Sequence, residues 1–360
     1  MWKSLKDRAE GVKEMKRMKT TEAVGQVLCH DITQIIPGVT KDAVFRKGHI
    51  IREEDIPVLL SVGKDSVYIW ENDETMMHEN DAAEVLYRMA ANEHMHPSDV
   101  KEGKIEAIAD TEGLLKVDRE KLKKVNAFGE MMIATRHGNT VVKKGDKLAG
   151  TRIIPLVIKK DKMQEAEKIC DGTPILKILP FTVKKAAIIT TGNEVYHGRI
   201  KDAFTPVIEQ KIAEFGAEMM FHEIFDDNDR KITDGCLRAI EAGADIVFCT
   251  GGMSVDPDDK TPLAIKNTGA DIVSYGASVL PGAMFMLAYY QVTEGDDPRT
   301  VAIMGLPGCV MYAKRTIFDL VLPRVMADVP VTKADLAKMG AGGLCLNCPT
   351  CIFPNCGFGK

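Results

Sequence analysis

The chain has 360 residues, too many for one compact core, so two or three domains are expected. Hydrophobic residues make up 45% and charged residues 28%, which is typical of a soluble globular protein. The formal net charge of -5, with no long basic tract, argues against nucleic acid as the main partner.

Neither a secretory signal nor a membrane span is predicted. The first twenty residues carry a basic excess but no apolar run. Residues 272–293 carry no charge, but Pro281 and Gly282 interrupt them, which favours two buried strands joined by a turn. Nine cysteines without a signal imply a reducing compartment, so we expect a cytoplasmic protein without a membrane partner.

The N-terminal half predicts two small units. Residues 1–77 alternate short apolar runs with turn residues, which indicates a β-rich domain. Residues 78–183 have a mixed pattern and predict an α/β linker domain. Within it we expect helices over 78–96 and 113–126 and a strand over 152–158.

Residues 184–330 alternate strands and helices at the spacing of right-handed βαβ units. This pattern predicts an α/β fold in which a mostly parallel sheet is covered by helices on both faces. The predicted strands cover 185–192, 217–225, 244–252 and 300–308, and the predicted helices cover 205–216, 229–243, 262–269 and 310–326.

Three glycine-containing loops should meet at the carboxyl edge of this sheet, where open α/β sheets bind ligands. They are "TTGNE" (190–194), "TGGMSVDPDD" (250–259) and "GLPG" (305–308). Glycine permits positive φ and close approach of a ligand, and backbone N–H groups favour an anion. One such loop alone would be an ordinary tight turn, but three loops at one edge predict a phosphate site.

Carboxylates crowd the same edge. They belong to Glu194, Asp227, Asp256, Asp258 and Asp259. A phosphate beside several carboxylates is repelled unless a cation lies between them, and Mg²⁺ is held by one or two carboxylates plus phosphate oxygens. Taken singly, an acid such as Asp259 could instead cap the helix that follows it.

Together these motifs resemble the molybdopterin-binding domain shared by enzymes of molybdenum cofactor assembly. The loop at 190–194 resembles that family's TGDE motif, and "DDND" with Asp227 resembles its Asp pair. "TGGMSVDPDDKTP" (250–262) resembles TGG…D-x-T-P, and "GLPGCV" (305–310) resembles GLPGNP. Their order and spacing agree over residues 184–327.

The resemblance implies a three-layer αβα fold that binds molybdopterin or its adenylate, with Mg²⁺. By this resemblance Glu194 and Asp227 bind metal or orient molybdate, and Asp259 acts at the phosphate end. Relatives in this family form homodimers, so a homodimer is expected. The residues implied to hold the pterin and its phosphate are Thr191, Gly192, Asn193, Thr250, Gly251, Gly252, Ser254, Gly305, Pro307 and Gly308.

The extra upstream region resembles that of molybdotransferases, which insert molybdate into adenylated molybdopterin. The chain departs from that pattern at Leu280 and Ala283, where lysines are expected, and at Cys309, where Asn is expected. It also lacks an A-M-D-G-Y-A segment. The expected function is molybdopterin binding in molybdenum cofactor biosynthesis. The enzymatic activity expected at this site is Mg²⁺-dependent insertion of molybdate into adenylated molybdopterin. The alternatives are a non-catalytic cofactor carrier or sensor, and a nucleotide pyrophosphatase of the related competence-damage type.

The tail, residues 331–360, contains four closely spaced cysteines: Cys345, Cys348, Cys351 and Cys356. The spacing resembles the C-x2-C-x2-C-x3-C run of bacterial ferredoxins, with one more residue in the last gap. Zinc sites usually present two separated C-x-x-C pairs, so a [4Fe–4S] cluster is favoured over Zn²⁺. The alternative is a tail of unliganded thiols. Such a centre would suit docking onto an iron–sulfur molybdoenzyme.

Overall fold

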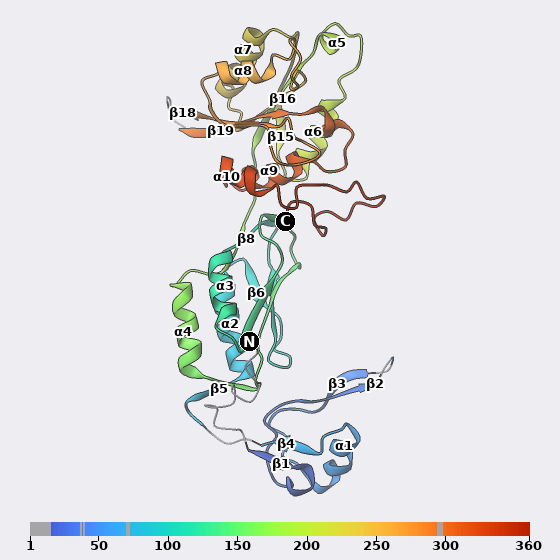
Figure 1. Cartoon of the computed structure of the whole chain (residues 1–360), viewed down its shortest axis with the longest axis vertical. Coiled ribbons are helices and arrows are strands. Elements are labelled where there is room, and N and C mark those ends of the chain that lie inside the picture. The colour runs from blue at the N-terminus through green and yellow to red at the C-terminus, as the bar shows by residue number, and fades with distance from the viewer. Residues whose placement is uncertain (1–15, 37, 39, 70–72, 294–297) are drawn as a thin grey trace, which may run out of the picture.

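The protein is elongated, with three units stacked along its long axis (Figure 1). No helix in the part of the chain that the structure describes is long and apolar enough to span a bilayer. The basic N-terminal segment, residues 1–15, lies outside that part. The computed structural model describes residues 16–36, 38, 40–69, 73–293 and 298–360.

The N-terminal unit is a small, mostly antiparallel β structure, as predicted. Two strand pairs, β1 with β4 and β2 with β3, surround a core that includes the fully buried Leu28, Ile32 and Leu59. Its elements are β1 (Arg17–Lys19), η2 (Thr20–Glu22), β2 (Ile32–Ile36), β3 (Thr40–Phe45), η3 (Glu53–Asp55), α1 (Ile56–Ser61) and β4 (Ser66–Tyr68).

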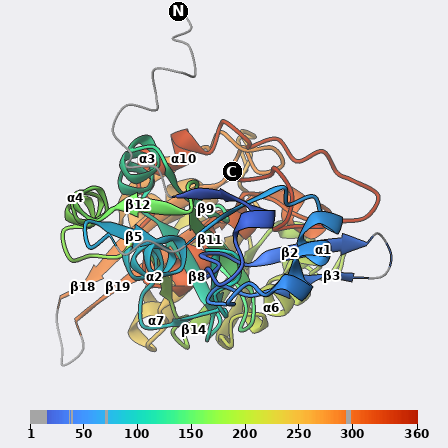
Figure 2. The ribbon, with the colours of Figure 1, turned by 90° about the horizontal axis from the view of Figure 1, so that it is seen from below.

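The middle unit packs three helices against one side of short antiparallel sheets (Figures 1 and 2). The hairpin β2–β3 of the preceding unit projects away from the side that α4 occupies (Figure 2). The elements are β5 (Met76–His78), α2 (Glu79–Ala90), β6 (Met95–Pro97), β7 (Ile105–Ala109), β8 (Gly113–Val117), α3 (Arg119–Ala127), β9 (Met131–Thr135), β10 (Thr140–Val142), β11 (Lys147–Ile153), β12 (Val157–Lys159), α4 (Lys160–Cys170) and β13 (Leu176–Leu179).

Both helices predicted in the middle unit are wrong over part of their length. The helix over 78–96 ends at Ala90, and β6 follows it. The helix over 113–126 begins only after Asp118, because β8 pairs with strands on both sides. The Asp118 carboxylate then caps α3 by accepting a hydrogen bond of 3.0 Å from the N–H of Lys121. Strand pairing here overrides the local helical pattern.

The C-terminal unit contains a six-stranded sheet in the order β15-β14-β16-β19-β18-β17. The first four strands are parallel, β18 runs antiparallel to them, and β17, which is antiparallel to β18, runs in the same direction as the first four. Its elements are β14 (Lys185–Thr191), α5 (Asn193–Tyr196), α6 (Phe204–Ala213), β15 (Glu218–Phe225), α7 (Asp229–Glu241), β16 (Ile246–Thr250), α8 (Thr261–Asn267), β17 (Asp271–Tyr275), β18 (Met286–Val292), β19 (Arg299–Leu306), η4 (Gly308–Met311), α9 (Ile317–Met326) and α10 (Lys333–Lys338).

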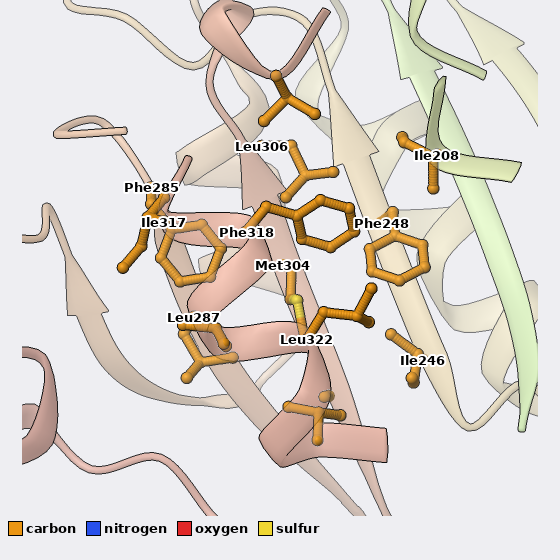
Figure 3. Close-up of a cluster of buried hydrophobic side chains, with 14 of the residues drawn as sticks. Ile208, Ile246, Phe248, Phe285, Leu287, Met304, Leu306, Ile317, Phe318 and Leu322 are labelled. Carbon is orange, nitrogen blue, oxygen red and sulfur yellow. The ribbon is translucent and has the colours of Figure 1, made fainter. Parts of the chain in front are cut away.

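Two hydrophobic clusters, one on each face of this sheet, confirm the predicted three-layer arrangement. Helices α6 and α9 cover one face and α7 and α8 the other. On the first face, the ring of Phe248 from β16 meets that of Phe318 from α9 edge to face, with centroids 5.4 Å apart (Figure 3). Every residue of β16 is buried, as expected for a central parallel strand.

The uncharged segment 272–293 forms the antiparallel pair β17 and β18, as predicted. The prediction that both strands are buried is wrong for β17, which lies at the edge of the sheet and is partly exposed. The helix predicted over 310–326 is wrong in its first part. Only the short η4 follows the GLPG loop, and α9 starts at Ile317. Thr316 and Asp319 form a capping box, which starts a new helix at that point.

Candidate functional site

The three predicted loops do meet at one edge of the C-terminal sheet. Thr190 at the end of β14 pairs with Thr250 of β16, and Thr250 pairs with Leu306 of β19. Because these strands are parallel, the segments that follow them lie side by side. The loop after β15, which carries Asp227, joins the same edge because Thr191 pairs with Phe225.

Gly251 and Gly252 hold the β16 loop tightly against β14. Both have positive φ, +82° and +53°. A Cβ on Gly251 would overlap the carbonyl oxygen of Thr191, so no other residue fits there without a shift. The buried hydroxyls of Thr191 and Thr261 lie 3.1 Å apart and join β14 to the first residue of α8.

Backbone N–H groups are free at this edge. Among the described residues, none accepts a hydrogen bond from the N–H of Gly252, Met253 or Ser254, and none accepts one from Gly308. Ser254 and Gly308 are exposed. A run of unpaired N–H groups after a positive-φ glycine forms an anion-binding concavity. The edge therefore offers backbone donors to an anion.

Two residues that sequence reasoning missed support this loop. The Tyr275 hydroxyl donates to the carbonyl oxygens of Met253 and Ser254, both at 3.0 Å. The side chain of Met253 is buried and lies so close to Gly305 that a Cβ there would overlap it. No local sequence signal marks these contacts, because they join separate strands.

The predicted carboxylates lie around the free N–H groups. Asp227 accepts a hydrogen bond of 3.0 Å from the N–H of Asn193. Burial raises the pKa of Asp227, and the charges of Glu194, Asp258 and Asp259 add to the increase, against the effect of the Asn193 hydrogen bond. These four acids therefore interact through space, as the sequence predicts.

Asp259 also shapes its own loop. Its carboxylate accepts a hydrogen bond of 3.0 Å from the N–H of Asp256, and its N–H donates to the Asp256 carbonyl at 2.9 Å. Asp259 is partly buried, whereas Asp256 and Asp258 are exposed. It therefore does not cap α8, whose N-cap is Lys260.

Cations at this edge are already engaged. Lys231 lies 2.8 Å from Asp226, and the Lys260 ammonium donates to the carbonyl of Pro257. In the described chain, no group of three His, Cys, Asp or Glu side chains is arranged to hold a metal ion. The donor set still suits Mg²⁺, which needs only one or two carboxylates when phosphate oxygens complete its shell.

A second polar network lies beside the first loop and was not predicted. Asp202 accepts hydrogen bonds from the hydroxyls of Thr190 and Thr205 at 2.9 and 2.6 Å, and from two backbone N–H groups at the start of α6. His222 lies 3.2 Å from both hydroxyls. These hydrogen bonds lower the pKa of Asp202, although burial opposes them. The network anchors the first turn of α6.

The remaining predicted site residues differ in exposure. Thr250 is fully buried, and its hydroxyl has no partner among the described residues. Pro307 is buried and accepts a hydrogen bond of 3.0 Å from the N–H of Val310. Gly192 is buried with φ +131°, whereas Asn193 and Glu194 are exposed.

The four tail cysteines lie apart from the glycine loops, on the wall of one cavity of about 280 Å³. Cys348 and Cys351 are exposed, and Cys345 and Cys356 are partly buried. Four of the other five cysteines, Cys29, Cys170, Cys236 and Cys249, are buried, and Cys309 is partly buried.

Two segments of the chain match protein-family models. Residues 17–71 match a domain of unknown function, and residues 187–327 match a family described as a probable molybdopterin binding domain. The second segment contains all the glycine loops and carboxylates described above.

Curated relatives match over short segments. A putative competence-damage inducible protein of Bacillus velezensis is 32% identical over 85 residues, which is 24% of this chain and 20% of the relative. Its namesake in Bacillus cytotoxicus is 33% identical over 122 residues, 33% of this chain and 29% of the relative. The match thus spans less than a third of the length of either relative.

Solved structures of other proteins are similar to part of this chain. The tungsten cofactor synthesizing protein MoaB from Pyrococcus furiosus is 20% identical, covering 41% of this chain and 89% of its own, with a TM-score of 0.31. The protein CinA with unknown function from Thermoplasma acidophilum is 16% identical, covering 40% and 98%, with a TM-score of 0.32. By its match to the family model, the segment 187–327 belongs to the molybdopterin-binding domain family.

Proposed function

We propose that the carboxyl edge of the six-stranded sheet binds molybdopterin, or its adenylate, in molybdenum cofactor biosynthesis. The observation that carries the proposal is the run of free N–H groups at Gly252, Met253 and Ser254, with Gly308 beside it. These donors suit the terminal phosphate of the pterin, and they lie within the family-matched segment.

The acids give the proposed site its dependence on a cation. With Lys231 and Lys260 engaged elsewhere, a phosphate at this edge meets the charges of Glu194, Asp227 and Asp259. Mg²⁺ held by Asp227 and Glu194 would neutralise this repulsion and polarise the phosphate. In this arrangement the Asn193 N–H keeps Asp227 oriented, and Asp259 acts at the phosphate end.

Molybdate insertion is the reaction we propose for the same site. It consumes adenylated molybdopterin and molybdate and releases AMP. The experiment incubates the full chain with both substrates, with and without Mg²⁺, and measures bound pterin by its fluorescence and free AMP by chromatography. Mg²⁺-dependent AMP release with molybdenum retained on the pterin is the expected result.

Two variants sharpen the experiment. Asp227→Asn should remove most of the Mg²⁺ dependence, whereas Asp256→Asn should not, because the Asp256 side chain is exposed and only its backbone closes the loop. Pterin binding without AMP release would reject insertion and leave a cofactor carrier. Failure to bind either molybdopterin or its adenylate would reject the proposed function altogether.

A further inference from the structure

The cysteine-rich tail is a closed loop docked on the C-terminal unit. Leu280 donates its N–H to the carbonyl of Gly343 and accepts a hydrogen bond from the N–H of Cys345, both at 2.8 Å. At the other end, Gly359 donates to Gly342 at 2.9 Å. Phe358 is 5% exposed and belongs to the core under α9. The expectation of a loose tail of thiols does not fit these contacts.

Inside this loop, the four cysteines border one cavity of about 280 Å³. Cys345 and Cys356 pack against the core of the domain, and Cys348 and Cys351 come from the solvent side. Apolar side chains, including Leu344 and Phe353, make up much of the remaining wall. Among the described residues that line the cavity there is no Asp or Glu.

Cations surround the thiols. Lys314 donates to the carbonyls of Cys348 and Pro349 at 2.9 and 2.8 Å, which fixes the turn between two cysteines. Arg315 lies 5.0 Å from the centre of the Phe353 ring and donates to the carboxylate of Asp319 at 2.8 Å. Lys360 donates to the carbonyl of Pro354. These contacts fix the backbone of the loop around the cysteines.

The arrangement of the four thiols bears on whether they bind a single zinc ion or an iron–sulfur cluster. A single Zn²⁺ draws four sulfurs to about 2.3 Å from one point. Here the four thiols line one open cavity of about 280 Å³. A cube of four irons and four sulfides is larger and takes one cysteine at each iron.

We propose that this cavity holds a [4Fe–4S] cluster ligated by Cys345, Cys348, Cys351 and Cys356. The four thiolates supply one ligand to each iron, and Lys314 holds the turn that carries Cys348. This site is separate from the proposed molybdopterin site and does not depend on it.

The chain connects the cluster site to the edge that carries the glycine loops through two segments. Leu280, on which the tail docks, lies in the connection between β17 and β18, and β18 begins at Met286, the partner of Gly305. Lys314 follows η4, which extends from the GLPG loop.

The test uses the full chain, purified without oxygen and supplied with ferrous iron and sulfide. We expect about four irons and four labile sulfides per chain, with a reducible cluster spectrum by electron paramagnetic resonance. The double variant Cys348→Ser/Cys351→Ser should lose more than half of the iron. Both side chains are exposed, so the fold should remain intact by circular dichroism.

Cys170→Ala provides the matched control, because Cys170 lies in the middle unit away from the cavity. It should bind as much iron as the unmodified chain. One zinc per chain without labile sulfide would overturn the proposal. So would the absence of both metals, or iron content that the double variant leaves unchanged.

Discussion

The glycine-loop edge and the cysteine loop are built in opposite ways. At the edge, the free backbone N–H groups come from two loops that are 56 residues apart between Gly252 and Gly308, and strand pairing brings them together. In the tail, all four thiols come from one stretch of twelve residues, Cys345 to Cys356. The edge therefore depends on the sheet, whereas the tail depends on local spacing and on docking to Leu280.

This difference predicts how each region responds to substitution. Changes at the edge should disturb the sheet that supports it and lower the stability of the domain. Changes at exposed cysteines should remove a ligand and leave stability within about 0.5 kcal/mol. Three substitutions at the edge test this contrast in decreasing order of effect.

The largest effect is expected for Gly251→Ala. The new Cβ would overlap the Thr191 carbonyl, and the residue would also have to keep φ at +82°. We expect a loss of about 3 kcal/mol or more in the free energy of unfolding of the C-terminal unit, measured by scanning calorimetry. Gly269→Ala is the control, since Gly269 has the same φ but open space around it, and should cost about 1 kcal/mol. Equal losses would show that the Thr191 contact does not matter.

An intermediate effect is expected for Thr261→Val. This change keeps the side-chain shape but leaves the buried Thr191 hydroxyl, 3.1 Å away, without its partner. The expected cost is about 1 to 2 kcal/mol. The double variant Thr191→Val/Thr261→Val should be less destabilised than the sum of the single variants. Strict additivity in this cycle would contradict a direct link between the two loops.

The smallest effect is expected for Asp227→Asn, and its sign is opposite. Burial, together with Glu194, Asp258 and Asp259, raises the pKa of Asp227 above its ordinary 3.8. Because this pKa is raised, protonation of Asp227 stabilises the folded state relative to the unfolded state. This stabilisation is fully present below pH 3.8 and is lost as the pH rises through the pKa of Asp227 in the folded state. At neutral pH the variant should therefore be more stable, by less than about 1 kcal/mol.

Thermal unfolding at several pH values checks this prediction. The advantage of the Asp227→Asn variant should shrink as the pH falls toward 3.8. Mg²⁺ should stabilise the unmodified chain more than the variant, because it relieves the same repulsion. A variant that is less stable at neutral pH would indicate that the hydrogen bond from Asn193 outweighs the repulsion.

Much of the C-terminal fold could be predicted because its signals are local and regular. The runs that became β14 and β16 are mostly apolar, and the segments between the strands have helical spacing. From that alternation, the meeting of the glycine loops at one edge followed directly. The helix predicted over 310–326 failed because apolar spacing does not reveal that Thr316 starts a new helix.

The sequence by itself determined the order of strands and helices, the glycines and acids of the loops, and the spacing of the four tail cysteines. Only the tertiary structure decided that Tyr275 supports Met253 and Ser254, that Thr191 faces Thr261, and that the tail closes against Leu280. These contacts join residues far apart in the chain. Their partners are selected by sheet order and side-chain packing, which no local pattern encodes.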